Sequence, residues 1–221
     1  MRTVVFDLDG TLADTSADLI ASANHCLVAL GHGARLDPVA DALTAFQGGR
    51  AMLRLGFERV GIDWTEADVD GQYPILLRAY GEAIAVHTRL YPGAAEAVEG
   101  LRAAGYATAI CTNKPEGLAR TLLAHLGVTD LFGAMIGADT LPVRKPDAAP
   151  YVAAVKGAGG AVDRSMLVGD TETDRLTGRA AGVPVALVTF GPEGRAIERL
   201  DPEALLDDYA DLPEVARRLI G

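Results

Sequence analysis

Lysine is the scarcest charged residue in this chain, although acidic residues are plentiful. Only three lysines, at positions 114, 145 and 156, stand among its 20 basic residues, and the others are arginines. The 30 acidic residues outnumber the basic ones and give the 221-residue chain a formal net charge of -10. Because affinity for phosphate backbones comes from a net basic face, this charge argues against nucleic acid as a partner. A small anionic ligand would need a local positive site.

Cysteine and long hydrophobic runs are also lacking. Cys26 and Cys111 are the only cysteines, and two thiols in apolar runs imply no disulfide framework. No segment approaches the roughly 20 apolar residues that a membrane-spanning helix needs. The apolar run near the N-terminus is too short for a signal peptide, and no cleavage site follows it. We therefore expect a cytoplasmic protein with no membrane partner.

Serine and histidine are rare as well, which removes several kinds of active site. None of the three serines lies in a Gly-x-Ser-x-Gly motif, and the four histidines lack the spacing of a metal site. The glycine-rich run at residues 157–160 has neither a dinucleotide-binding fingerprint nor the lysine of a P-loop. The chemistry must therefore come from other residue types.

Five short apolar runs recur along the chain, and each is typical of a strand buried on both faces of a sheet. They comprise residues 4–6, 109–111, 134–136, 166–168 and 185–188. Helical patterns lie between them; for example, Leu118, Leu122 and Leu126 share one helix face. This alternation predicts a doubly wound, Rossmann-like α/β core with a parallel sheet of about five strands.

One long segment breaks the alternation. Residues 15–85 contain no convincing strand and show successive helical patterns, which start near Ser16 and at Asp37-Pro38 and then cover residues 50–60 and 66–84. The α/β pattern resumes after this segment. We therefore predict a helical cap domain at residues 15–85, inserted into an α/β domain formed by residues 1–14 and 86–221.

Charged and polar residues gather where the predicted strands end, which is where open α/β sheets bind their ligands. They are Asp7, Asp9, Gly10 and Thr11 after the first strand, Thr112, Asn113 and Lys114 after the second, and Asp170 and Asp174 after the fourth, with Lys145 in a loop before a helix. Each has an ordinary alternative, since aspartate and threonine form turns and helix caps and a lysine can be a surface charge. Their joint occurrence in this order favours a single site.

The order of these residues resembles the four motifs of the haloacid dehalogenase superfamily. The match consists of Asp7-x-Asp9-Gly10-Thr11, then Thr112, Lys145 and Gly169-Asp170-x-x-x-Asp174, and it spans the chain. The inserted helical segment is similar to the first type of cap domain in that superfamily. Within the superfamily, the stretches Asp7–Thr15 and Cys111–Pro115 look most like the phosphoglycolate phosphatase group.

The resemblance implies a phosphatase that acts on a small phosphorylated metabolite. Asp7 would attack phosphorus and form an aspartyl-phosphate, while Asp9 would first protonate the leaving oxygen and then activate the hydrolytic water. Two unit charges about 4 Å apart repel by roughly 4 kcal/mol at an effective dielectric of about 20. Lys145 and the Thr112 hydroxyl, with neighbouring backbone amides, would offset this repulsion at the transferring phosphoryl group.

The resemblance also implies a bound Mg²⁺. Asp7, Asp170 and the backbone carbonyl of Asp9 would be its ligands, with Asp174 as a supporting or alternate ligand. Lysine carries a compact ammonium that the flat guanidinium of arginine does not replace. Two of the three lysines nevertheless fall at motif positions of this arginine-rich chain, which is consistent with a geometric demand of the site.

Substrate selection is expected from both domains. In the α/β domain, the resemblance makes Gly10, Asn113 and Lys114 candidates for contact with the substrate. In the cap, the stretch around Gly49 and Arg50 interrupts the helical pattern, and the equivalent loop of the family faces the active site. Arg50 could hold a substrate carboxylate in a bidentate fork. Arg54 and Arg78, on helix surfaces, are weaker candidates for the same contact. The alternative for the stretch itself is an ordinary interhelical turn with a solvated arginine.

Several related activities stay open, and absences separate some of them. A phosphonatase of this superfamily needs a cap lysine, which residues 15–85 lack, and a dehalogenase lacks the second acid, present here as Asp9. A sugar-phosphate mutase resembling β-phosphoglucomutase, a pyrophosphatase and a nucleotidase remain as alternatives. A more distant one is a non-catalytic phospho-acceptor regulatory domain, which needs neither a cap nor Asp9. The sequence is compatible with a homodimer but does not fix the oligomeric state.

Overall fold

The computed structural model describes all 221 residues, which divide into two compact units. The core unit comprises Met1–Ala13 and Leu90–Gly221, and the helical unit comprises Asp14–Arg89. The sequence predicts the inserted segment at residues 15–85. Two short strands, β2 (Ala13–Asp14) and β3 (Arg89–Leu90), pair where the chain passes from one unit to the other.

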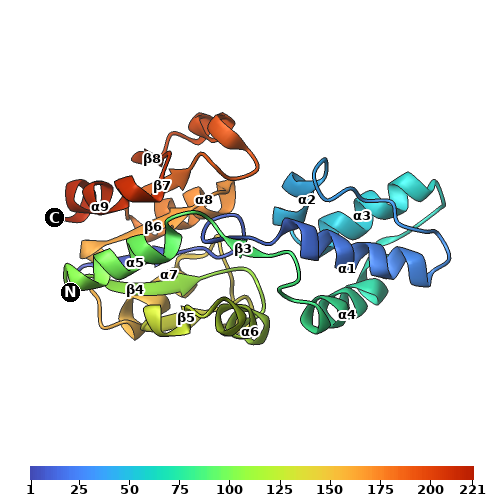
Figure 1. The fold of residues 1–221 in the computed structure, drawn as a ribbon, viewed down its shortest axis with the longest axis horizontal. Coiled ribbons are helices and arrows are strands. Elements are labelled where there is room, and N and C mark those ends of the chain that lie inside the picture. Colours follow the sequence, from blue (N-terminus) through green and yellow to red (C-terminus); the bar gives the residue numbers. More distant parts are fainter. The chain divides into compact units, whose positions relative to one another are not determined.

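Six parallel strands form the sheet of the core unit, in the order β5-β4-β1-β6-β7-β8 (Figure 1). They are β1 (Thr3–Phe6), β4 (Ala107–Cys111), β5 (Ala134–Ile136), β6 (Ser165–Gly169), β7 (Val185–Val188) and β8 (Ala204–Leu206). The predicted parallel α/β core is confirmed, but the count of about five strands is one short. The missed strand, β8, is a three-residue edge strand with the sequence Ala-Leu-Leu between acidic residues, and alanine and leucine favour helices over strands.

The order of the strands places a crevice at the end of β1. From β1 the chain continues to β4 and β5 on one side, and then to β6, β7 and β8 on the other. A reversal of this kind opens a crevice at the carboxyl ends of the strands, where ligands bind. All four residues of β1 are fully buried, and Val5 lies opposite Ala109 on one side and Leu167 on the other. The central position explains why β1 is a continuous apolar run.

Helices cover both faces of this sheet. They are α5 (Ala94–Ala103), α6 (Glu116–Leu126), α7 (Ala148–Gly157), α8 (Glu172–Ala181) and α9 (Leu212–Ile220), and short 3₁₀ helices cover Thr129–Leu131, Val162–Arg164, Gly194–Leu200 and Tyr209–Asp211. α7 packs on β1, β4 and β5, beside α8 on β6 and β7, whereas α5 and α9 contact each other on β4, β6 and β8. Tyr151 of α7 is fully buried in the cluster that contains Val5, Ala109 and Leu167.

The helical unit contains four helices around its own apolar core (Figure 1). They are α1 (Ser16–Ala29), α2 (Ala42–Phe46), α3 (Gly49–Val60) and α4 (Glu66–Glu82). Leu27, Met52, Phe57 and Leu76 are buried in this core. α1 and α3 approach closely at Gly56, because a Cβ there would lie 2.7 Å from Cδ1 of Leu27.

The helix start predicted at Asp37-Pro38 is wrong by about one turn. The Asp37 carboxylate accepts hydrogen bonds from the amides of Val39 and Ala40, at 2.9 and 2.8 Å, as a cap does. The backbone forms a turn there, and α2 begins only at Ala42. Capping chemistry of this kind also stabilises isolated turns, so it does not guarantee a helix.

Cysteine residues and long apolar segments are both scarce in this chain. Cys26 and Cys111 are buried and form no disulfide, as the sequence predicts. None of the helices combines the length and the apolar character that crossing a membrane requires.

Candidate active site

Asp7 lies at the carboxyl end of β1, with 8% of its surface exposed. Its amide donates to the carbonyl of Val168 in β6 at 2.9 Å, which anchors it to the sheet. Its Oδ1 accepts a hydrogen bond from the Leu8 amide at 2.7 Å and lies 3.1 Å from Nζ of Lys145. Both contacts fall on one oxygen, so Oδ2 remains open to an external ligand.

Lys145 is buried rather than a surface charge, with 3% of its surface exposed. Its Nζ lies between two carboxylates, 3.1 Å from Oδ1 of Asp7 and 2.7 Å from Oδ1 of Asp174. The side chain of Asn113 donates to the Lys145 carbonyl at 3.1 Å and so holds the loop in place. Asp147 caps α7 by accepting from the amide of Ala149 at 2.7 Å. Lys145 therefore projects from a loop that is fixed on both sides.

Asp174 is fully buried, and both of its oxygens are engaged within the protein. Its Oδ2 accepts hydrogen bonds from the hydroxyl and amide of Thr171, at 2.6 and 3.1 Å, and from the Asp170 amide at 3.3 Å. This capping box starts α8 directly after β6. Because Oδ1 binds Lys145, Asp174 positions the lysine and the Asp170 loop at the same time.

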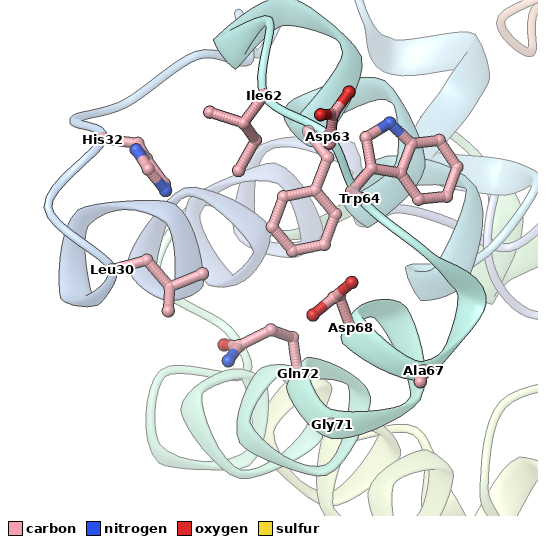
Figure 2. A pocket seen from close by; sticks show the side chains of 10 residues that line it. Leu30, His32, Ile62, Asp63, Trp64, Ala67, Asp68, Gly71 and Gln72 are labelled. Atoms are coloured by element: carbon pink, nitrogen blue, oxygen red, sulfur yellow. The ribbon is translucent and has the colours of Figure 1, made fainter.

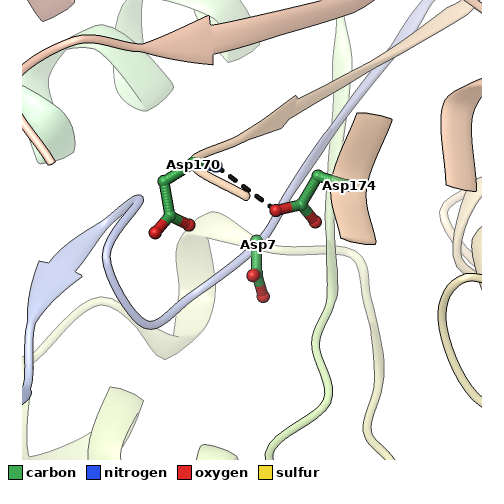
Figure 3. A group of neighbouring side chains, drawn as sticks. All are labelled: Asp7, Asp170 and Asp174. Carbon is green, nitrogen blue, oxygen red and sulfur yellow. Dashed lines mark hydrogen bonds between the residues drawn. The ribbon is translucent and has the colours of Figure 1, made fainter. Parts of the chain in front are cut away.

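Three aspartates gather at the ends of β1 and β6 (Figure 3). Asp7, Asp170 and Asp174 each offer one carboxylate oxygen, and these atoms lie within 4.8 Å of one another. One ammonium, that of Lys145, is paired with two of the three carboxylates. Three carboxylates against one such ammonium leave a buried excess of negative charge, which a divalent cation would neutralise.

The electrostatics of the group reflect this crowding. Burial raises the pKa of Asp7 to about 7, with Lys145 opposing the shift and Asp174 adding to it. Burial and the charges of Asp174 and Asp7 raise the pKa of Asp170 well above its ordinary value. Burial alone would lower the pKa of Lys145, but Asp174 and Asp7 raise it above its ordinary value. Lys145 therefore stays protonated, while Asp7 and Asp170 resist ionisation without a further cation.

A second group of residues follows β4. The amide of Thr112 donates to the Ile136 carbonyl at 3.0 Å, and its Oγ1 accepts from the Lys114 amide at 3.1 Å. Fewer backbone amides around Thr112 are therefore available to bind phosphate than the resemblance implies, because the amides of Thr112 and Lys114 already have partners. The amide of Asn113 and the Thr112 hydroxyl proton remain for a ligand.

Lys114 is paired with the second aspartate of the first motif. Its Nζ lies 2.9 Å from Oδ1 of Asp9, and its side chain is only 3% exposed. Asp9 is more open, with 18% of its side chain exposed. The structure therefore brings Lys114 to Asp9, whereas the sequence predicts it as a contact for the substrate.

Gly10 lies where no larger residue fits. Its φ is 79°, and a Cβ there would lie 2.2 Å from Oδ2 of Asp170. The adjacent Thr11 is fully buried and donates its hydroxyl to Oδ1 of Asp170 at 2.8 Å. The turn after β1 thus contacts both oxygens of Asp170.

Gly49 and Arg50 belong to the helical unit, at the first turn of α3. Arg50 forms an ion pair with Asp70 of α4, and its guanidinium lies 4.4 Å from the ring centre of Tyr73. Its side chain is 41% exposed. These two residues thus belong to a different unit from the groups described above, and Arg50 has partners within its own unit.

The helical unit has a cavity of about 270 Å³ that contains none of the predicted site residues (Figure 2). Apolar and aromatic side chains line it, including Trp64, which stacks on Phe57 with ring centres 6.1 Å apart. Asp63 and Asp68 also line the cavity. No lysine or arginine lines the cavity to offset these carboxylates, whereas Lys114 and Lys145 lie beside the aspartates at the strand ends of the core unit. The strand ends are therefore the better site for a phosphate ester.

Two residues of the site, Thr171 and Tyr209, are absent from the sequence prediction, and so is the hydrogen bond that Thr11 makes. Thr171 could have been found, since Thr171-x-x-Asp174 is a capping-box pattern before a helix. Thr11 belongs to the first motif, but nothing in the sequence indicates its bond to Asp170. Tyr209 donates a hydrogen bond to the Thr11 carbonyl at 2.8 Å, from a distant part of the chain that carries no motif.

Comparison with known proteins defines the class of this chain. Residues 4–188 match the model of the family described as haloacid dehalogenase-like hydrolase. Because the match covers most of the chain, the chain belongs to this family. The resemblance inferred from the motifs is thereby confirmed.

Several individual proteins are similar to this chain over nearly its whole length. The chain is 41% identical over 221 residues to the phosphoglycolate phosphatase of Agrobacterium fabrum, with 98% of this chain and 93% of that protein covered. It is 38% identical over 218 residues to the phosphoglycolate phosphatase of Mesorhizobium japonicum, with 98% and 96% covered. Its fold matches the crystal structure of a predicted phosphoglycolate phosphatase from Haemophilus somnus 129pt, with a TM-score of 0.85, 28% identity and 97% of each chain covered.

Proposed function

We propose that this chain is a Mg²⁺-dependent phosphoglycolate phosphatase that works through an aspartyl-phosphate on Asp7. The observation that carries the proposal is the buried Asp7 carboxylate, held by Lys145 and grouped with Asp170 and Asp174 at the strand ends. The 41% identity to the phosphoglycolate phosphatase of Agrobacterium fabrum supports the choice of substrate.

The donor set fits Mg²⁺. This ion prefers hard oxygen ligands and usually keeps several waters, so one or two carboxylates suffice. Asp7 and Asp170 would hold it, because Asp7 has an oxygen without a partner and Asp170 has Thr11 on one oxygen only. Asp174 supports the site through Lys145 and Thr171. When bound, the cation would neutralise charge at the carboxylates and the phosphate.

In the first half of the reaction, an oxygen of Asp7 attacks phosphorus and the bond to the ester oxygen breaks. Asp9 donates its proton to that oxygen, so glycolate leaves with a neutral hydroxyl group instead of an alkoxide. Lys145 and the Thr112 hydroxyl stabilise the charge on the phosphoryl oxygens. Lys114, in the segment after β4, holds the Asp9 side chain in place.

In the second half, Asp9 removes a proton from water, and the water oxygen attacks the phosphorus of the aspartyl-phosphate. The bond between phosphorus and Asp7 breaks, which releases inorganic phosphate and restores the Asp7 carboxylate. Asp9 regains the proton that it donated in the first half. Lys145 keeps its proton throughout, because Asp7 and Asp174 raise its pKa.

The proposal is tested by phosphate release from a panel of small phosphate esters, with and without Mg²⁺. We expect kcat/KM to be highest for 2-phosphoglycolate and activity to vanish in EDTA. Higher kcat/KM for hexose phosphates, pyrophosphate or nucleotides would replace the substrate assignment with one of the alternatives. Absence of release from every ester would favour the phospho-acceptor regulatory domain.

The metal-free protein should become less stable as the pH rises from about 6 to about 8. The folded pKa values of Asp7 and Asp170 are raised, so the folded state holds protons that the unfolded state has already released. Stability is then lost as the pH increases through the folded pKa. Thermal unfolding in EDTA measures this effect, and Mg²⁺ should raise the midpoint more at the higher pH. Asp170→Asn should weaken both trends, and a midpoint that rises with pH in EDTA would contradict them.

We propose that Arg50 releases its partner Asp70 and binds the carboxylate of the substrate instead. Arg50→Gln should raise KM for 2-phosphoglycolate about 10-fold, because it removes a charge-assisted hydrogen bond. KM for p-nitrophenyl phosphate, which lacks a carboxylate, should not change. Arg54→Gln is the matched control, since Arg54 is also 41% exposed and pairs with Glu66 of α4. Equal effects on the two substrates, or equal effects of the two variants, would count against this role.

Asp9→Asn should separate substrates by their leaving groups. An alkoxide needs the proton that Asp9 supplies, so turnover of 2-phosphoglycolate should fall about 100-fold or more. Nitrophenolate leaves without a proton, so formation of the aspartyl-phosphate from p-nitrophenyl phosphate should be much less affected. Single-turnover kinetics measure this step for each ester. Full turnover of 2-phosphoglycolate by the variant would remove Asp9 from the mechanism.

A further inference from the structure

Two consecutive hydrogen bonds connect the C-terminal part of the chain to Asp170. Tyr209, in the 3₁₀ helix before α9, is only 1% exposed and donates its hydroxyl to the carbonyl of Thr11 at 2.8 Å. Thr11 donates its own hydroxyl to Oδ1 of Asp170, also at 2.8 Å. Tyr209 is therefore linked to Asp170 through a single residue of the turn after β1.

This turn controls where the Asp170 carboxylate lies. The Thr11 hydroxyl occupies Oδ1, and a Cβ on Gly10 would lie 2.2 Å from Oδ2. A Cβ on Gly191 would lie 3.2 Å from the Gly10 carbonyl and 3.5 Å from Cβ of Asp170. The turn and the carboxylate are thus packed tightly, so a displacement of the turn must move the carboxylate as well.

Tyr209 is itself held firmly. Its ring packs against Phe190, with ring centres 5.2 Å apart, and Phe190 packs against Tyr91 at 4.9 Å. A Cβ on Gly93 would lie 3.3 Å from Cβ of Tyr209. The hydroxyl therefore has little freedom, and it presents a fixed donor to Thr11.

We propose that Tyr209 is a positioning residue for the metal site, acting on Asp170 through Thr11. The inference rests on the proposed function, in which Asp170 is a ligand of Mg²⁺. Residues that orient a metal-ligating side chain through hydrogen bonds commonly lower metal affinity by about 10- to 100-fold when they are replaced. Tyr209 lies outside every motif of the site, so this role is independent of the motif residues themselves.

The experiment measures Mg²⁺ affinity directly, by calorimetric titration of the metal-free full-length chain. Tyr209→Phe removes one buried hydroxyl and keeps the ring. Tyr151→Phe is the matched control, because Tyr151 is also fully buried in the core unit and donates its hydroxyl to Ser165 at 2.7 Å. We expect the Kd for Mg²⁺ to rise about 10-fold in Tyr209→Phe and to stay within about twofold in Tyr151→Phe.

Two further variants locate the effect. Thr11→Val removes the intermediate hydroxyl and should also raise the Kd for Mg²⁺. In the double variant with Tyr209→Phe, the total increase in Kd should be smaller than the product of the increases in the two single variants. Equal Mg²⁺ affinity of Tyr209→Phe and wild type, or equal weakening by Tyr151→Phe, would overturn the inference. Asp170→Asn tests the premise separately. If Asp170→Asn binds Mg²⁺ as tightly as the wild type, the proposed metal site is refuted. If Asp170→Asn loses Mg²⁺ affinity but Tyr209→Phe keeps it, only the role of Tyr209 is refuted.

Discussion

Asp7→Asn is expected to abolish phosphate release, with kcat falling by roughly four orders of magnitude or more. An amide cannot attack phosphorus as a carboxylate does, and no other carboxylate occupies its position at the end of β1. The substitution keeps the size of the side chain, and the Asn oxygen can still accept from the Leu8 amide, which donates to Oδ1 of Asp7 at 2.7 Å. The loss of activity is measured by phosphate release from 2-phosphoglycolate under saturating Mg²⁺.

Thermal unfolding of the metal-free variant separates chemistry from folding. Burial raises the pKa of Asp7 to about 7, so its ionised form is unfavourable in the folded protein at higher pH. Replacing it by neutral asparagine should therefore preserve or raise the unfolding midpoint at about pH 8. Residual turnover close to wild type would refute Asp7 as the nucleophile. A large drop in the midpoint would refute the electrostatic account of its burial.

Lys145→Met is expected to reduce both activity and stability. Removing the ammonium leaves the carboxylates of Asp7 and Asp174 without their cation, and breaking a buried ion pair in this way costs about 3 kcal/mol or more. The transferring phosphoryl group also loses its positive partner, so kcat/KM should fall roughly 1000-fold. Denaturant unfolding and steady-state kinetics measure the two effects.

Lys156→Met is the control for this substitution. Lys156 is exposed in the last turn of α7, so the same change should alter stability and activity very little. Lys145→Arg should not restore activity, because the guanidinium is larger and flat whereas the site surrounds a compact ammonium. Wild-type activity in Lys145→Arg would contradict a demand for lysine at this position.

The buried strands were predictable because burial on both faces leaves a direct mark in the sequence. β1, β6 and β7 match apolar runs that need no knowledge of the rest of the chain. β8 is a short run of alanine and leucine, which also favour helices, so only its pairing with β7 defines it as a strand. The turn at Asp37 is a similar case, since local capping chemistry is compatible with either a turn or a helix.

The site was predictable where function depends on the order of motifs, and less so where it depends on tertiary contacts. Asp7, Lys145 and Asp174 are recognised from the sequence, and the structure brings them into contact. The pairing of Lys114 with Asp9 and the bond from Tyr209 to Thr11 join residues far apart along the chain. No local pattern encodes such contacts, because they arise only when the strands and the C-terminal segment pack together.

The most direct test of the account is to identify the phosphorylated residue. The Asp9→Asn variant, in which hydrolysis of the intermediate is slowed, is mixed with Mg²⁺ and p-nitrophenyl phosphate, whose leaving group needs no proton from Asp9. The protein is then quenched in acid and analysed by peptide mass spectrometry. The account predicts one phosphoryl group on the peptide that contains Asp7, lost on treatment with hydroxylamine as an acyl phosphate is, and absent from Asp7→Asn. Phosphate release with no phosphorylated enzyme, or a phosphoryl group on another residue, would contradict it.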